Sequence, residues 1–165
     1  MVFKVKKHNI ELYTTLLYLS RNLNFYKEIN LKDTFETRIY LMFLHFSIIL
    51  IIFKKKRINF PQELYDGLFK CIENNLRELG LGDVGVNKKM KTLNKIFYDI
   101  LLKVNLTKNG FKINKSIVLK YFDNLNESKN SEYELFSGYF LNFFHFCFEL
   151  SPKTMIKDAL KFKDQ

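Results

Sequence analysis

The residues best suited to contact another molecule lie between Leu76 and Lys91. The segment 76–86 holds glycines at positions 80, 82 and 85 and an aspartate at position 83. Glycine lets the backbone adopt left-handed conformations, and an aspartate carboxylate can accept hydrogen bonds from nearby backbone N–H groups. We therefore expect a stiff loop over residues 81–86 that recognises a partner. A plain interhelical turn with solvated lysines is the alternative.

Three lysines follow this loop, at the predicted start of a helix near Asn87. Their charge has the wrong sign for the positive end of a helix dipole, so the helix start should attract an anion or an acidic partner. The predicted partner-binding residues are Leu76, Arg77, Glu78, Gly80, Gly82, Asp83, Val84, Val86, Lys88, Lys89 and Lys91.

Two of the four arginines have glutamates beside them or within one helical turn. If the helices that carry Arg38 and Arg77 pack antiparallel, as their short connection suggests, Arg38 lies close to Arg77 and Glu78. Ion pairs that tie the helices together are the expected result, among Arg38, Arg77, Glu73 and Glu78.

The histidines and cysteines do not form a recognisable metal site. His45 and His145 each lie in an apolar helical pattern without a second ligand four residues on, so both are expected to be hydrogen-bonded core histidines. Cys71 and Cys147 are isolated and fit buried thiols in a reducing compartment. We find no nucleophile–base arrangement, phosphate loop or dinucleotide motif, and therefore predict no cofactor, no metal and no enzymatic activity.

The C-terminal segment after Pro152 is predicted to form a short basic helix. Lys153, Lys157 and Lys161 share one side of it, and apolar residues share another. A basic amphipathic helix can lie on an anionic membrane, so these three lysines are membrane-surface candidates. A solvated terminal helix is the alternative that the nearby aspartates favour.

Helical periodicity dominates the elements that must position these residues. We predict an all-α fold, a single-domain bundle of about six helices in which the core spans about 10–150 and a tail helix spans 151–165. Capping boxes are predicted at Asp33–Glu36 and Ser131–Glu134, and residues 105–114 are predicted to connect two helices without a strand. The predicted helices cover about 10–20, 33–55, 61–79, 87–104, 115–125 and 131–150.

The net charge of +10 is weak evidence for a nucleic-acid partner. Only four of the 27 basic residues are arginines, and Lys, Asn, Ile, Phe and Tyr, which A/T-rich codons encode, supply nearly half of the chain. The longest uncharged run, residues 39–53, is shorter than the roughly 20 residues of a bilayer span, so we expect a buried core helix. The first seven residues lack the pattern of a signal peptide.

Several of these residues resemble the ubiquinol–cytochrome c chaperone family, the assembly factors of the cytochrome bc1 complex. The densest match is Leu-Arg-Glu-x-Gly-x-Gly-Asp-x-x-Val-x-Lys-x-Met at residues 76–90. Further matches are Ser20-Arg21 with Phe25-Tyr26, and Asp33-Thr34 with Arg38 and Leu44-His45. The chain departs from the family pattern at Tyr40, at Asn87 and at Phe97-Tyr98-Asp99-Ile100, where members commonly have Glu, Pro and Phe-Tyr-Gly-Arg.

The resemblance implies a non-enzymatic helical chaperone that binds newly made cytochrome b, or another bc1 subunit, as its client. It implies action at the cytoplasmic face of a bacterial inner membrane, or on the matrix side in mitochondria. The ribosome, an anionic membrane surface and a second chaperone subunit remain open as further partners. Two other functions also remain open from the residues alone: a basic protein that contacts RNA or the ribosome, and a helical domain that binds a lipid or small ligand.

Overall fold

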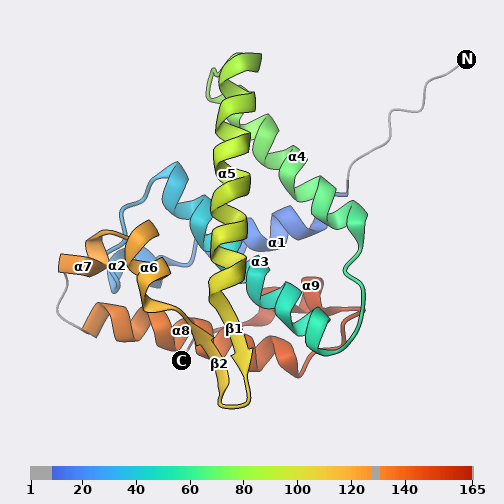
Figure 1. Ribbon diagram of the computed structural model, residues 1–165, viewed down its shortest axis with the longest axis vertical. Helices are drawn as coiled ribbons and strands as arrows, with labels where there is room; N and C mark the ends of the chain where they lie inside the picture. Colours follow the sequence, from blue (N-terminus) through green and yellow to red (C-terminus); the bar gives the residue numbers. More distant parts are fainter. Residues whose placement is uncertain (1–8, 128–130, 165) are drawn as a thin grey trace, which may run out of the picture.

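The central element of the protein is a long buried helix, α3, over Phe35–Lys55. The structure is a computed structural model that describes residues 9–127 and 131–164. Figure 1 shows α3 behind the upright helix in the middle of the fold. Because α3 is apolar on nearly every side, its stability depends on neighbours that cover it. The helices that pack against α3 are α1 (Glu11–Ser20), α5 (Asp83–Lys103) and α8 (Ser131–Phe148).

Among the described helices, α3 alone is long and apolar enough to cross a membrane by length and composition. In its most apolar stretch, 61% of the residues are buried inside the protein. The aromatic rings of Phe43 and Phe46 pack against Phe97 of α5 at centroid distances of 5.2 and 5.4 Å. These contacts confirm the predicted buried core helix over residues 39–53.

The other elements complete a helical shell around α3. Helix α4 (Gln62–Glu78) packs on α1 and α5, and α6 (Lys115–Tyr121) packs on α5. The predicted helix over 115–125 is split, because Phe122 and Asp123 interrupt it. Helix α8 begins at Ser131, and residues 128–130 of the predicted polar break lie outside the described residues. The remaining helices are α2 (Leu23–Lys27), α4 (Gln62–Glu78), α6 (Lys115–Tyr121), α7 (Asn124–Glu127), α9 (Met155–Asp158) and the 3₁₀ turn η1 (Ala159–Lys161).

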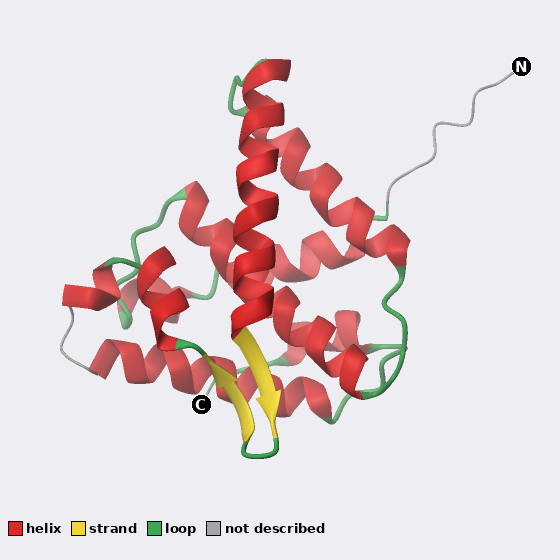
Figure 2. Ribbon diagram, in the orientation of Figure 1, coloured by secondary structure: helices red, strands yellow, loops and turns green. Residues whose placement is uncertain are grey.

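One short hairpin interrupts the helices, and Figure 2 shows it in yellow. Strand β1 (Val104–Thr107) pairs antiparallel with β2 (Gly110–Ile113), with Thr107 opposite Gly110. The all-α class is confirmed, but the prediction of a strand-free connection over 105–114 is wrong. A two-residue turn closes the hairpin, and Gly110 follows it with φ 105°. The alternating apolar residues at 104, 106, 111 and 113 were the sequence signal for two strands.

Helix α3 is capped by a different residue from the one predicted. Thr34 is the N-cap, and its hydroxyl accepts a hydrogen bond from the Thr37 backbone N–H at 3.1 Å. Asp33 instead accepts hydrogen bonds from the Arg38 guanidinium at 2.8 and 3.0 Å. The predicted cap at Asp33 is therefore wrong by one residue, because the arginine one turn into the helix engages the carboxylate.

The C-terminal segment packs into the core. Met155, Ile156 and Ala159 are buried, and the Thr15 hydroxyl of α1 donates a hydrogen bond to the Ile156 carbonyl at 3.0 Å. The predicted tail helix is shorter than expected and ends in the 3₁₀ turn. The apolar residues of the tail therefore pack on α1 and, through Phe162, on α8.

His45 lies at the centre of an aromatic cluster between α3 and α8. Its Nδ1 lies 2.7 Å from the Leu41 carbonyl oxygen, and its Nε2 lies 2.8 Å from the Tyr139 hydroxyl. Complete burial lowers the pKa of His45 from 6.5 to about 4, so the ring is neutral near pH 7. Nδ1 then donates to the carbonyl, and Nε2 accepts from Tyr139. His145 is exposed, so the prediction that it is a core histidine is wrong.

Candidate binding surface at the α4–α5 tip

Helix α4 ends in a glycine turn that fixes the direction of the chain. The Gly80 N–H donates to the Arg77 carbonyl at 2.9 Å, and the Leu81 N–H donates to the Leu76 carbonyl at 3.3 Å. This pair of bonds is the Schellman motif, which requires a left-handed residue just beyond the helix. Gly80 has φ 92°, a conformation that glycine adopts without steric penalty. Gly80 is therefore the residue just beyond the helix, in agreement with the predicted helix end at about residue 79.

Helix α5 begins four residues earlier than the sequence suggested. Gly82 is its N-cap and Asp83 its first residue, so the first turn carries an acidic side chain that complements the dipole. The predicted start at Asn87 is wrong, as is the predicted loop over 81–86. The lysines at 88, 89 and 91 lie in the second and third turns, where the dipole has little effect.

Arg77 ties the end of α4 to the start of α5. Its guanidinium makes a short ion pair with Asp83 and a second one with Glu73 at 3.1 Å. Hydrogen bonds from Arg77 first, and then from Lys70, lower the pKa of the Glu73 carboxyl. Arg77 therefore clamps the turn, and the predicted ion pair between Arg77 and Glu73 is present. Glu78 makes no ion pair with any described residue.

Three apolar side chains project from this clamped turn, and we call them the tip. Leu79 is 64% exposed, Leu81 40% and Val84 71%. Figure 1 shows the turn at the upper end of the molecule, where α4 meets α5. Exposed aliphatic residues at a tight turn are unusual because turns favour polar residues. The tip is therefore an exposed apolar surface held on two helix ends.

The structure separates the predicted partner-binding residues into two groups. Leu76 and Val86 are buried, with 1% and 0% exposure, so they anchor the tip and cannot touch a partner. Gly80, Gly82, Asp83 and Val84 remain at the surface, as do Arg77 and Glu78. Leu79 and Leu81 were not among the predicted residues, although both are exposed at the turn. Their signal was an apolar residue on each side of Gly80, where solvent exposure is expected.

The lysines of α5 lie below the tip. Lys89 makes an ion pair with Glu36 at 3.4 Å and so links α5 to the first turn of α3. Lys88 and Lys91 are exposed and make no ion pair with a described residue. The predicted basic helix start is therefore two exposed lysines on the side of a helix, with one further lysine used in packing.

A groove of about 490 Å³ lies beside the tip, and we call it the tip groove. Arg38 and Glu78 both line it, as the predicted closeness of the two helix ends requires. They make no ion pair with each other, and Arg38 pairs with Asp33 instead. Its charged lining residues are Arg21, which follows α1, Arg38 of α3 and Glu78 of α4. The groove is lined by Tyr13, Leu17, Arg21, Phe35, Arg38, Ile39, Met42, Asn75, Glu78 and Leu79.

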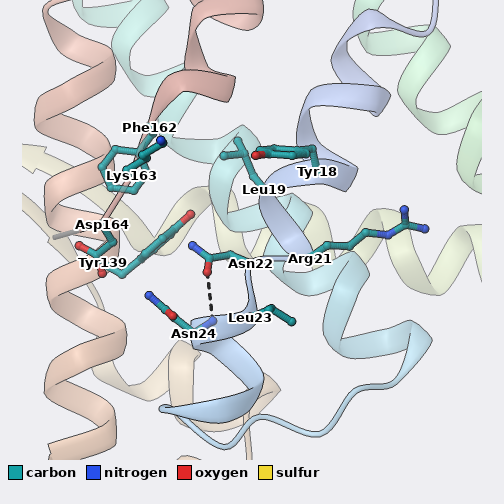
Figure 3. Close-up of a pocket in the computed structure, with 10 residues that line it drawn as sticks. All are labelled: Tyr18, Leu19, Arg21, Asn22, Leu23, Asn24, Tyr139, Phe162, Lys163 and Asp164. Atoms are coloured by element: carbon teal, nitrogen blue, oxygen red, sulfur yellow. Dashed lines mark hydrogen bonds between the residues drawn. The ribbon is translucent and has the colours of Figure 1, made fainter.

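A second groove, of about 520 Å³, lies between α1, α2 and the C-terminal segment (Figure 3). Tyr139, Phe162 and Asp164 form one side of it, and Tyr18, Leu19 and Arg21 lie opposite. Asn22 caps α2 between them by accepting from the Asn24 N–H at 3.0 Å. The groove opens to solvent, since Tyr18 is 62% exposed. Its volume is within the range of small-ligand sites, so the small-ligand alternative stays a prediction.

The remaining predicted sites lie apart from the tip. Lys153, Lys157 and Lys161 are exposed on the tail, and Lys161 makes an ion pair with Asp158 at 3.2 Å. Within residues 9–127 and 131–164, no group of three or more His, Cys, Asp or Glu side chains is placed to hold a metal ion. Cys147 is buried and Cys71 half-buried, and both are free thiols. The arrangement of the tip supports recognition of an apolar partner.

The fold is a helical bundle that carries three exposed aliphatic residues on a turn held by Arg77. A family model described as ubiquinol-cytochrome C chaperone matches residues 27–129, well over half of the chain. The protein therefore belongs to the ubiquinol–cytochrome c chaperone family, as its sequence indicated, and a chaperone role follows from that membership. Comparisons with curated proteins and with solved structures found no match.

Proposed function

We propose that the protein is a non-enzymatic assembly chaperone that binds newly made cytochrome b of the bc1 complex. The observation that carries the proposal is the tip, Leu79, Leu81 and Val84, within the region that the family model matches. A client destined for a membrane exposes apolar segments before insertion, and burying them against aliphatic side chains is favourable in water. The clamp at Arg77 supports this role because a fixed turn loses little conformational entropy on binding.

The tip groove extends the proposed contact surface. Leu79 belongs to both the tip and the groove, so an apolar segment can pass from one to the other. Arg21 and Glu78 offer one charge of each sign at its edges. Polar groups at the margin of an apolar site fix orientation more than affinity. We therefore assign binding energy to the tip and orientation of the client to the groove.

The proposal also includes a location and partners. We propose action at the cytoplasmic face of the inner membrane in a bacterium, or on the matrix side in a mitochondrion. Cytochrome b is the proposed client, with another bc1 subunit as the nearest substitute. A second chaperone subunit would be recovered together with the client if one takes part. RNA or the ribosome remains the alternative partner for the exposed lysines.

A pair of double variants tests the role of the tip in cells. Leu79→Ser with Val84→Ser removes the two most exposed tip residues, and Leu135→Ser with Leu141→Ser removes exposed leucines from α8 as a matched control. Reduced-minus-oxidised haem spectra of membranes measure assembled cytochrome b. We expect the tip variant to lower the cytochrome b signal several-fold and the control to leave it unchanged. Equal signals in both strains would remove the tip from the proposed function.

Affinity purification tests the client directly. The wild-type protein, isolated from detergent-solubilised native membranes, should retain cytochrome b, and the tip double variant should not. Thermal unfolding of both purified proteins shows whether the variant remains folded. Retention of ribosomal components without any bc1 subunit would instead favour the alternative partner.

A further inference from the structure

The opposite end of α5 carries a surface of different chemistry, which we call the basal groove. Two adjoining hollows, of about 450 and 340 Å³, lie between the end of α3 and the start of β1. They share Ile51, Lys54, Val104 and Asn105 and so lie side by side, and the name covers both of them. Figure 1 shows the hairpin at the end of α5 that lies away from the tip.

The charges in the basal groove are all positive. Lys54, Lys55 and Arg57 line it together with no acidic side chain, and none of the three makes an ion pair with a described residue. Lys56, between them, points inward and donates to the Phe148 and Leu150 carbonyls at 2.6 and 2.9 Å. The negative end of the α3 dipole favours cations here, but it does not require the three exposed ones to remain unpaired.

Exposed aliphatic side chains accompany these cations. Leu102 lines the groove and is 74% exposed, and Ile58, directly after Arg57, is 44% exposed. The α3 dipole explains neither of them. Aliphatic residues next to lysines are typical of surfaces that enter the headgroup region of a bilayer. Surfaces that bind single-stranded nucleic acid instead use aromatic side chains for stacking, and the residues that line the basal groove include none.

We propose that the basal groove docks on an anionic phospholipid bilayer. Lys54, Lys55 and Arg57 attract the headgroup phosphates, while Leu102 and Ile58 enter the interface. The inference assigns the membrane contact to the end of α3 and not to the tail lysines. Because α5 has 21 residues, the tip lies about 30 Å from this surface. The docking concerns the isolated protein and does not depend on which client the tip binds.

Vesicle flotation with matched charge variants tests the proposal. The full-length protein is mixed with vesicles of phosphatidylglycerol and phosphatidylethanolamine, or with vesicles of phosphatidylcholine alone. One variant carries Lys54→Gln, Lys55→Gln and Arg57→Gln, and the control carries Lys153→Gln, Lys157→Gln and Lys161→Gln. Each cation near an anionic surface contributes about a fivefold change in affinity. The groove variant should therefore bind anionic vesicles roughly a hundredfold more weakly, and the tail variant nearly as well as wild type.

A third variant separates lipid docking from simple charge attraction. Leu102→Ser keeps every charge and should still weaken binding to anionic vesicles roughly fivefold. Equal losses in the groove and tail variants, a larger loss in the tail variant, or equal binding of wild type to both vesicle types would each overturn the proposal. If the groove variant instead loses binding to a single-stranded RNA while its vesicle binding is unchanged, the proposal is overturned in favour of RNA.

The two proposals fail independently. The groove variant leaves the tip intact, so it should still retain cytochrome b from detergent-solubilised membranes. The tip double variant should still bind anionic vesicles like wild type.

Discussion

The two ends of the molecule use the same helix-ending motif with different residues in the left-handed position. At the end of α4, that position is Gly80 with φ 92°; at the end of α3, it is Arg57 with φ 57°. In both turns the next residue donates to a carbonyl five residues back, Leu81 to Leu76 at 3.3 Å and Ile58 to Phe53 at 3.0 Å. A side chain in this conformation costs about 1 kcal/mol relative to glycine. The α3 end thus retains a cation where glycine would be more stable.

The pairing of the charges separates the two ends further. At the tip, Arg77 makes two ion pairs and the exposed residues are aliphatic. At the basal groove, Lys54 and Arg57 make no ion pair with a described residue, and exposed Leu102 lines the groove next to Lys54. Charge at the tip therefore holds a turn in shape, while charge at the groove faces outward. The same backbone motif therefore supports a rigid turn after α4 and a positively charged surface after α3.

Mild acid should weaken both ends together, because they share one core. The pKa of His45 is lowered to about 4 in the folded protein, against 6.5 for an unperturbed histidine. As the pH falls below about 6.5, His45 takes up a proton in the unfolded chain but stays neutral in the folded core. The free energy of unfolding therefore falls. The linkage predicts a loss of about 2 kcal/mol in the free energy of unfolding between about pH 7 and pH 5. Urea unfolding at the two pH values measures it.

Two histidine variants provide the control for this measurement. His45→Gln replaces the titrating ring with a neutral amide and should remove most of the difference between the two pH values. His145→Gln changes an exposed histidine and should leave the difference as in wild type. If acid destabilises the His45→Gln protein as much as wild type, His45 is not the group responsible for the pH dependence.

A substitution at Gly80 should affect the tip alone. Gly80→Ala adds a Cβ that meets no atom within 4 Å, so the expected penalty comes only from the left-handed backbone. We expect a loss of about 1 kcal/mol in the free energy of unfolding. Gly85→Ala is the matched control, because its added Cβ would sit 3.5 Å from Leu81 in ordinary contact within a helix. A larger loss at Gly85 than at Gly80 would contradict the turn as described.

Periodicity was sufficient to predict the bundle but not the exact ends of its helices. The apolar run of α3 and the glycine after α4 each have one physical explanation, so both were predictable. The start of α5 was not, because Asp83 and Gly85 suggested a loop while Val86 is buried by contacts from elsewhere in the fold. The hairpin at 104–113 was missed because its strands are only four residues long.

The sequence predicted which segment carries exposed residues at the end of α4, but not which side chains are exposed there. The segment 76–91 contains the tip, and its exposed residues include Leu79 and Leu81, which were not predicted, besides Lys88 and Lys91. Exposure depends on which side of α4 packs on α1, and sequence spacing alone does not determine it. The basal groove could not be predicted from the sequence either. Lys54 and Leu102 are distant in sequence and come together only because α3 packs on β1 and α5.

Arg57→Gly gives the smallest change and the sharpest comparison between the two ends. It converts the α3 turn into the glycine form found at Gly80, which should stabilise the fold by about 0.5 to 1 kcal/mol. The same change removes one cation from the basal groove, so binding to anionic vesicles should fall about fivefold. Thermal unfolding and vesicle flotation on one protein measure both effects.

Gained stability with weakened binding would show that the arginine is kept for its charge. Unchanged binding would place the docking surface elsewhere, and lost stability would mean that Arg57 makes a contact worth more than its backbone strain.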